Sequence, residues 1–277
     1  MDMTMDDSKS TNSSLLPMII VGGLFFVFGF VTWLNGSLIP FLQIACELNH
    51  MEAYLVTMAF YIAYTVMALP MAAILKRTGY RNGMMLGLLV MAVGALVFIP
   101  AAEIRSYTVF LIALFILGTG LTILQTASNP YIVHIGPRET AAVRISIMGL
   151  LNKGAGIVAP LIFTAFILSD MSQFTAERLE SLSEAQRSIE LAELSGRLVT
   201  PYILMAAMLL FLAAVVKLSP LPEITFDDEG TEGTEKDSIL QYPQLILGAI
   251  SLFFYVGVEV IAGDTIGLFG KEMGVSN

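Results

Sequence analysis

The chain has 277 residues, of which 56% are hydrophobic and 13% charged, with a net charge of −9 and a mean hydropathy of +0.78. This much apolar surface exceeds what one soluble core can bury, which excludes an ordinary soluble enzyme and gives no basic surface for nucleic acid. The sequence therefore predicts a membrane protein.

Seven stretches are long enough to cross a bilayer, whose core of about 30 Å needs roughly 20 apolar residues per helix. They cover approximately residues 15–42, 53–75, 83–102, 108–133, 144–168, 200–218 and 243–269. The first stretch is too long for a cleaved secretory signal and lacks a cleavage site, so we expect it to be retained. The sequence predicts an all-α, multi-pass protein.

The predicted domains follow from the spacing of these stretches. We expect a cytoplasmic tail (1–14), a six-helix bundle (15–218), an acidic cytoplasmic linker (219–242) and the first helix of a second, truncated bundle (243–277). Because no stop or capping feature marks Asn277 as a natural end, the chain is expected to be a fragment of a longer protein, with the missing C-terminal helices as a partner. The acidic segments 169–199 and 227–237 are interpreted as solvated connectors.

Basic residues predict the orientation, because Lys and Arg near helix ends resist translocation. A cytoplasmic N-terminus leaves only Arg105 and Lys271 in the short outer segments. The inner segments then hold Lys9, Lys76, Arg77, Arg81, Arg138, Arg144, Lys217 and Lys236.

Two similar strings, LNGSLIP (34–40) and LQTASNP (124–130), fall on the first and fourth stretches. Each has an amide after leucine and a proline five residues after the amide. This spacing is expected if three helices were duplicated to give six, as in transporters that build a binding site at mid-membrane.

Gln125 and Asn129 lie four residues apart, which places both amides on one helix face. An unpaired amide costs several kcal/mol in lipid, so this face must meet another helix or water. One interpretation is hydrogen bonding between helices. The other is a sugar site, since amides donate and accept as hydroxyls do.

Asn35, in the first stretch, has the same two interpretations. Thr32 and Trp33 favour a sugar site, because an indole can cover the apolar face of a pyranose. In the fifth stretch, Lys153 is an intramembrane charge, which indicates function unless it is ion-paired or reaches the interface. The small residues around Gly154 permit close helix packing.

The seventh stretch contains Glu259 and Asp264, about 140° apart around a helix. A carboxylate in a low dielectric can hold a proton near neutral pH, and with other oxygens it can hold sodium. Either ion could couple transport to a gradient, and pairing with Lys153 is the structural alternative. No other cofactor is expected, since Cys46, His50 and His134 show no metal-ligand spacing.

KRTGYRNG (76–83), with Lys76, Arg77, Gly79 and Arg81, is predicted to be a cytoplasmic tight turn. Its basic residues fix the topology. They could also bind the cytoplasmic ends of neighbouring helices and close the inner side in one state of an alternating-access cycle.

KRTGYRNG resembles the signature loop of the major facilitator superfamily, with Lys76 where that family usually has aspartate. TWLNGSLIPFLQ, PAAEIRSYTVFLIALFILGTGLTILQTASNPY and GPRETAAVRISIMGLLNKGAG resemble its fucose, glucose and galactose permease group over nearly all of residues 18–270, and the glucose/galactose branch fits best. The resemblance implies a twelve-helix sugar and cation symporter of a bacterial inner membrane.

The resemblance also bears on individual residues. Asn152 matches an amide that lines the cavity of the family and is expected to contact sugar. Fucose and proton symporters of the group carry carboxylates where this chain has Gly36 and Gln125, so proton coupling by that route is in doubt.

Two further hypotheses remain besides the symporter. A non-transporting half could assemble with a partner that supplies the other helices. A seven-helix receptor or retinal protein matches the helix count, but Lys271 lies at the outer end of the last helix instead of midway. No nucleophile, base and orienting group can be assembled, so the chain is not expected to be an enzyme.

Overall fold

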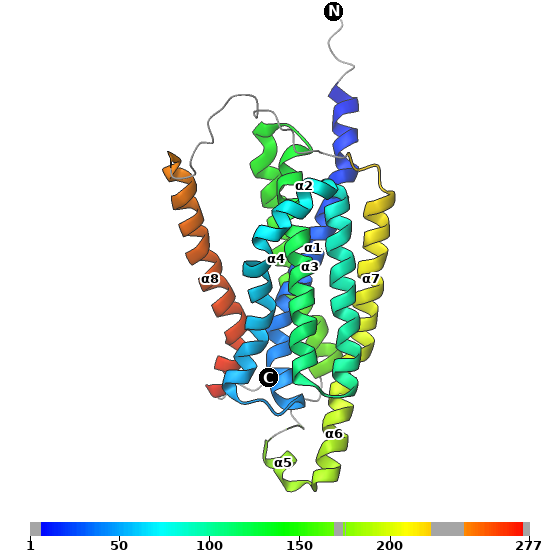
Figure 1. The fold of residues 1–277 in the computed structure, drawn as a ribbon, viewed down its shortest axis with the longest axis vertical. Helices are drawn as coiled ribbons and strands as arrows, with labels where there is room; N and C mark the ends of the chain where they lie inside the picture. The colour runs from blue at the N-terminus through cyan, green and yellow to red at the C-terminus, as the bar shows by residue number, and fades with distance from the viewer. Residues whose placement is uncertain (1–6, 169–173, 175, 223–240, 274–277) are drawn as a thin grey trace, which may run out of the picture. The chain divides into compact units, whose positions relative to one another are not determined.

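The computed structural model describes residues 7–168, 174, 176–222 and 241–273 (Figure 1). Its helices, in chain order, are α1 (Asp7–Ala45), α2 (His50–Glu103), α3 (Tyr107–His134), η1 (Arg138–Thr140), α4 (Ala141–Phe163), the π-helical turn η2 (Thr164–Leu168), α5 (Ala176–Ser181), α6 (Glu184–Gly196), α7 (Val199–Leu218) and α8 (Pro243–Glu272). All seven predicted stretches lie in these helices, which confirms the predicted all-α fold. In the described residues α1 covers Asp7–Ala45, so it includes part of the predicted tail.

Six helices in the described residues are long and apolar enough to cross a membrane, and α2 accounts for two of the seven predicted stretches. Its backbone leaves the helical conformation at Gly79 (φ 73°, ψ 175°), which only glycine adopts readily. The Tyr107 hydroxyl donates to the Glu52 carbonyl at 2.8 Å, so the first turn of α2 lies beside the residues that follow its C-terminal end. α2 is therefore a hairpin of two antiparallel halves that reverses in the predicted turn (Figure 1).

The segment 169–199, interpreted as a solvated connector, contains two helices in its described part. After α5, helix α6 begins with a reciprocal cap between Ser183 and Gln186 and continues almost directly into α7. It buries Leu191 and Leu194, and the Ser195 hydroxyl donates to the Ala102 carbonyl at 2.9 Å. α6 is an amphipathic helix, because its leucines recur at helical spacing and face the bundle. The high charge of the segment led to its interpretation as a connector.

A polar junction fixes the end of the bundle where α1 passes into α2. Arg105 donates to the Ala45 carbonyl through Nε (3.1 Å) and Nη2 (2.9 Å), and its guanidinium lies 3.5 Å from the Glu47 carboxylate. Glu47 is also ion-paired with Arg187 of α6. The junction thereby ties α6 to the loops that precede α2 and α3.

The chain divides into two compact units, Met1–Thr225 and Phe226–Asn277. The division falls within the predicted linker 219–242, of which residues 223–240 lie outside the described part. The first unit contains α1 to α7. The second contains α8, an apolar helix long enough to cross a membrane.

Candidate functional site: polar residues of α1, α3 and α4

Two glycines bring α1 and α4 into close contact. A Cβ at Gly29 would clash with the backbone carbonyl of Asn152, and one at Gly156 would lie 2.7 Å from Cδ1 of Trp33. The Asn152 side chain donates from Nδ2 to the Phe25 carbonyl at 3.3 Å. The structure thus brings the predicted site residues Trp33 and Asn152 to one helix pair.

Lys153 lies beside the same indole. Its Nζ is 5.1 Å from the centroid of the Trp33 ring, within the range of a cation–π interaction. The side chain of Lys153 is exposed and that of Trp33 is half-buried. The charge predicted inside the membrane is therefore held against an aromatic face at the surface of the bundle.

The predicted amides of α3 lie on its accessible side, with Gln125 half-buried and Asn129 exposed. The nearby hydroxyls have partners in their own helix: Thr126 donates to the Thr122 carbonyl and Ser128 to the Leu124 carbonyl, each at 2.7 Å. Back-bonding of this kind satisfies hydroxyls in an apolar medium. The amides therefore stand out as the groups of this segment that an external ligand could contact.

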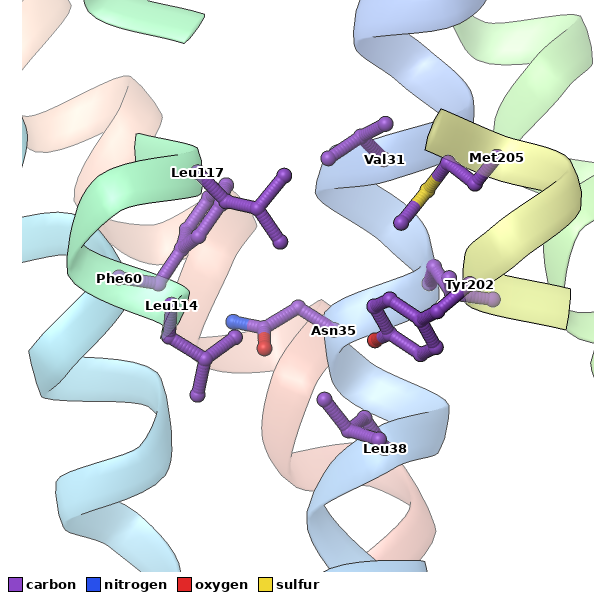
Figure 2. A pocket seen from close by; sticks show the side chains of 9 residues that line it. Val31, Asn35, Leu38, Phe60, Leu114, Leu117, Tyr202 and Met205 are labelled. Carbon is purple, nitrogen blue, oxygen red and sulfur yellow. The ribbon is translucent and has the colours of Figure 1, made fainter. Parts of the chain in front are cut away.

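Asn35 lies apart from these residues, in the interior of the bundle. It is only 3% exposed and borders a cavity of about 10 Å³ that is otherwise lined by Val31, Leu34, Leu38, Phe60, Leu114, Leu117, Tyr202 and Met205. Figure 2 shows its amide directed away from α1 toward Leu114. Two positions along a helix correspond to about 200°, so Asn35 and Trp33 occupy nearly opposite faces of α1.

The size of the Asn35 cavity limits what it can hold. A water molecule needs roughly 10–15 Å³ of such space, so a hexose does not fit. Neither polar atom of the Asn35 side chain has a hydrogen-bond partner among the described residues. Neither interpretation of Asn35 is thus supported by this cavity, because a hexose does not fit and the amide forms no hydrogen bond to a neighbouring helix among the described residues.

The turn around Gly79 is linked to the end of α7. Lys76 and Arg77 are exposed and Arg81 is half-buried. Asn82 donates to the Thr78 carbonyl at 3.1 Å and accepts from Lys217 Nζ at 3.3 Å. This link was not predicted, because it joins residues that are distant in sequence.

Arg144 is a second residue whose role was not predicted beyond topology. It is 5% exposed, and its guanidinium donates to the carbonyls of Ile132 (2.9 Å), Val133 (2.8 Å), Gly136 (3.3 Å) and Pro137 (3.0 Å) and to the Thr140 hydroxyl (2.6 Å). These acceptors lie at the C-terminal end of α3 and in the η1 turn, where carbonyls lack helical partners. The sequence shows only that Arg144 begins the polar end of an apolar stretch, which does not indicate this role.

The carboxylates Glu259 and Asp264 lie on α8, in the second unit. Their predicted role in cation coupling stays a prediction. Within the described residues, no group of three or more His, Cys, Asp and Glu side chains could hold a metal ion.

Comparisons with known proteins agree on one family. The profile of the Major Facilitator Superfamily matches residues 21–276. The glucose/galactose transporter of Brucella abortus is 38% identical over 241 residues, which is 87% of this chain and 55% of that protein. The L-fucose-proton symporter of Escherichia coli is 30% identical over 258 residues, which is 91% of this chain and 59% of that protein.

Solved structures give the same result. A crystal structure of the E. coli fucose:proton symporter FucP matches with a TM-score of 0.67 at 32% identity, covering 76% of this chain and 50% of that one. FucP in its outward conformation matches with a TM-score of 0.66 at 29% identity, covering 82% and 53%. The chain spans about half the length of these relatives. Its helical membrane fold, its sequence and its structural neighbours show that the chain belongs to the Major Facilitator Superfamily.

Proposed function

We propose that this chain is the first bundle, with one further helix, of a secondary transporter that takes up a glucose- or galactose-type hexose by cation symport. The observation that carries the proposal is the 38% identity to the B. abortus glucose/galactose transporter across 87% of the chain. The relatives named above are transporters and not enzymes, in keeping with the absence of a catalytic constellation in the sequence. We place the protein in a bacterial inner membrane with its N-terminus in the cytoplasm.

The sugar would contact Trp33 and Asn152 on the α1–α4 pair and Gln125 and Asn129 on α3. These side chains are exposed or half-buried on the first unit, and they supply one ring face and several amide donors and acceptors. A second bundle would supply the opposite wall of the pathway. Asn35, in the interior of the first unit, would support the wall that carries these four side chains.

Coupling to H⁺ or Na⁺ would use Glu259 or Asp264 on α8. The positions that carry carboxylates in fucose and proton symporters of the group are Gly36 and Gln125 here, and neither side chain can take up a proton near neutral pH. A protonatable or sodium-binding carboxylate must then come from elsewhere, and the apolar part of α8 carries Glu259 and Asp264.

A second candidate function is a half that transports only with a partner. Uptake of radiolabelled glucose and galactose should be measured in cells without hexose carriers that produce either this chain or the gene read beyond codon 277. Uptake by the longer product alone would support the proposed function with an incomplete chain.

The same assay also tests the substrate and the ion. Saturable glucose uptake that galactose inhibits, and L-fucose does not, is the expected result. Collapse of the proton gradient would abolish proton-coupled uptake, and replacement of Na⁺ by choline would abolish sodium-coupled uptake. Absence of saturable hexose uptake from both products, when both reach the membrane, would overturn the proposed function.

A further inference from the structure

A large apolar groove lies between α4 and α7, on a part of the bundle that the proposed sugar contacts do not use. α4 packs on α1 and α7 packs on α2, which leaves a hollow of about 670 Å³ between them with α1 as its floor. The floor is buried at Val27 and Leu34 of α1, which are 4% and 9% exposed. The walls are open, as Phe166 and Leu204 show at 77% and 65%.

The lining of the groove excludes a sugar as its occupant. Its polar contributors are Arg197, Thr200 and Tyr202, and the rest are aliphatic, aromatic, proline or methionine side chains. A hexose would leave most of its hydroxyls without partners there, whereas a hydrocarbon chain would lose nothing. An open apolar groove on a bundle that spans a membrane is filled from the bilayer around it.

The length of the groove matches one leaflet. Arg197 and Met208 mark its extent beside α7, and eleven positions at 1.5 Å per residue give about 16 Å. Half of a bilayer core of about 30 Å is about 15 Å. Arg197 lies two residues before the apolar helix α7, at the level where headgroups begin.

The charge at this end fits a phosphate. The guanidinium of Arg197 lies 5.6 Å from the ring of Phe174. A guanidinium can stack its face on a ring while its edge donates, and phosphate is a preferred bidentate partner. The exposed Thr200 lies in the next turn and also lines the groove.

We propose that the groove between α4 and α7 binds one acyl chain of a glycerophospholipid, with the phosphate of that lipid held at Arg197 and Thr200. This inference does not rest on sugar transport. It assigns Arg197, which lies in a segment first interpreted as a connector, to a lipid site.

The test compares two tryptophan substitutions on the same helix. Val158 lines the groove and is 36% exposed, whereas Val143 is 59% exposed and lies outside it. The full chain is reconstituted in nanodiscs of phosphatidylethanolamine and phosphatidylglycerol, and retained lipid is counted by native mass spectrometry. Val158→Trp should lower lipid retention about tenfold, because the indole displaces several methylene groups, and Val143→Trp should leave retention unchanged.

Arg197→Gln separates the headgroup from the chain and covers the case in which Val158→Trp does not fold. It should weaken phospholipid retention about tenfold while leaving retention of an uncharged fatty-acid methyl ester unchanged, since only the charged hydrogen bonds are lost. Equal lipid retention by the wild type and both Val158→Trp and Arg197→Gln would overturn the proposal. A dimer that Val158→Trp converts to monomer would also overturn it, because a second copy would then occupy the groove.

Discussion

The Lys153 ammonium and the Trp33 indole lie 5.1 Å apart, on helices that glycines bring into close contact. Trp33 is the only tryptophan in the chain, so its fluorescence reports on this one place. The contact joins a charge and a ring that lie 120 residues apart in the sequence. It also makes the proposed sugar wall accessible to direct measurement.

Binding of glucose or galactose should change the emission of Trp33, because a pyranose on the indole removes water and alters its distance from Lys153. The measurement is a titration of the purified chain with D-glucose, excited where tyrosine does not absorb. Trp33→Phe, which removes the signal, and L-glucose, the mirror-image sugar, are the controls. An unchanged spectrum at sugar concentrations that saturate binding in an independent assay would place Trp33 outside the sugar path.

Gln125→Ala and Asn129→Ala should each weaken hexose uptake by the transporting form. Loss of a hydrogen bond in a site that excludes water leaves a sugar hydroxyl unpaired, at a cost of about 1–3 kcal/mol. The apparent affinity for glucose should therefore fall by about 5-fold to 150-fold. Ser146→Ala is the matched control, since that exposed hydroxyl donates to the Ala142 carbonyl of its own helix at 2.9 Å. Wild-type kinetics in both amide variants would remove α3 from the site.

Gly29→Ala should destabilise the contact between α1 and α4. The added methyl group would meet the backbone of Asn152, which cannot move aside as a flexible side chain can, and overpacking of this kind costs about 1–3 kcal/mol. Gly23→Ala on the same helix is the control, because nothing lies within 4 Å of its Cβ position. Thermal unfolding in detergent should show a lower Tm for Gly29→Ala alone. The same Tm for both variants would contradict the packing described.

Arg144→Ala should be among the most damaging changes outside the sugar wall. It removes donors from four carbonyls and one hydroxyl, and each buried acceptor left unpaired costs about 1–3 kcal/mol. We expect poor yield and a free energy of unfolding lower by about 3 kcal/mol or more. Arg138→Ala is the control, since Arg138 is an exposed residue of η1. Normal stability of Arg144→Ala would show that this guanidinium does not hold the end of α3.

The Cys46 thiol, just beyond the end of α1, should react slowly with maleimides at neutral pH. Burial raises its pKa from 9.0 to about 11, Arg105 opposes this increase and Glu47 adds to it. The thiol stays protonated below that pKa, so at pH 8 only about one molecule in a thousand carries the reactive thiolate. The labelling rate should rise about tenfold per pH unit from pH 8 to pH 10.

Cys46 is the only cysteine, so Cys46→Ser must remove all labelling. A rate that levels off near pH 9 would show a thiol of ordinary pKa and contradict the burial. Arg105→Gln should slow labelling further, because loss of the positive charge raises the pKa again.

Hydropathy alone determined where the membrane helices lie. Each needs about 20 apolar residues, whereas a spanning strand needs only about 10, so the length and composition of these stretches were sufficient to predict helices. The turn of α2 at Gly79 was also predictable from local sequence, because the charged string KRTGYRNG separates two apolar stretches. α6 was not predicted, because its charge outweighed its few buried leucines in the composition of the segment.

Which polar residues face one another was decided only by the tertiary structure. Asn35 and Trp33 are two residues apart in the sequence, yet rotation about α1 places one in the bundle interior and the other against α4. Trp33 and Lys153 are distant in sequence, yet they are in contact because Gly29 and Gly156 admit the neighbouring helix. Periodicity gives the face on which a side chain lies, but the packing of the helices determines what that face meets.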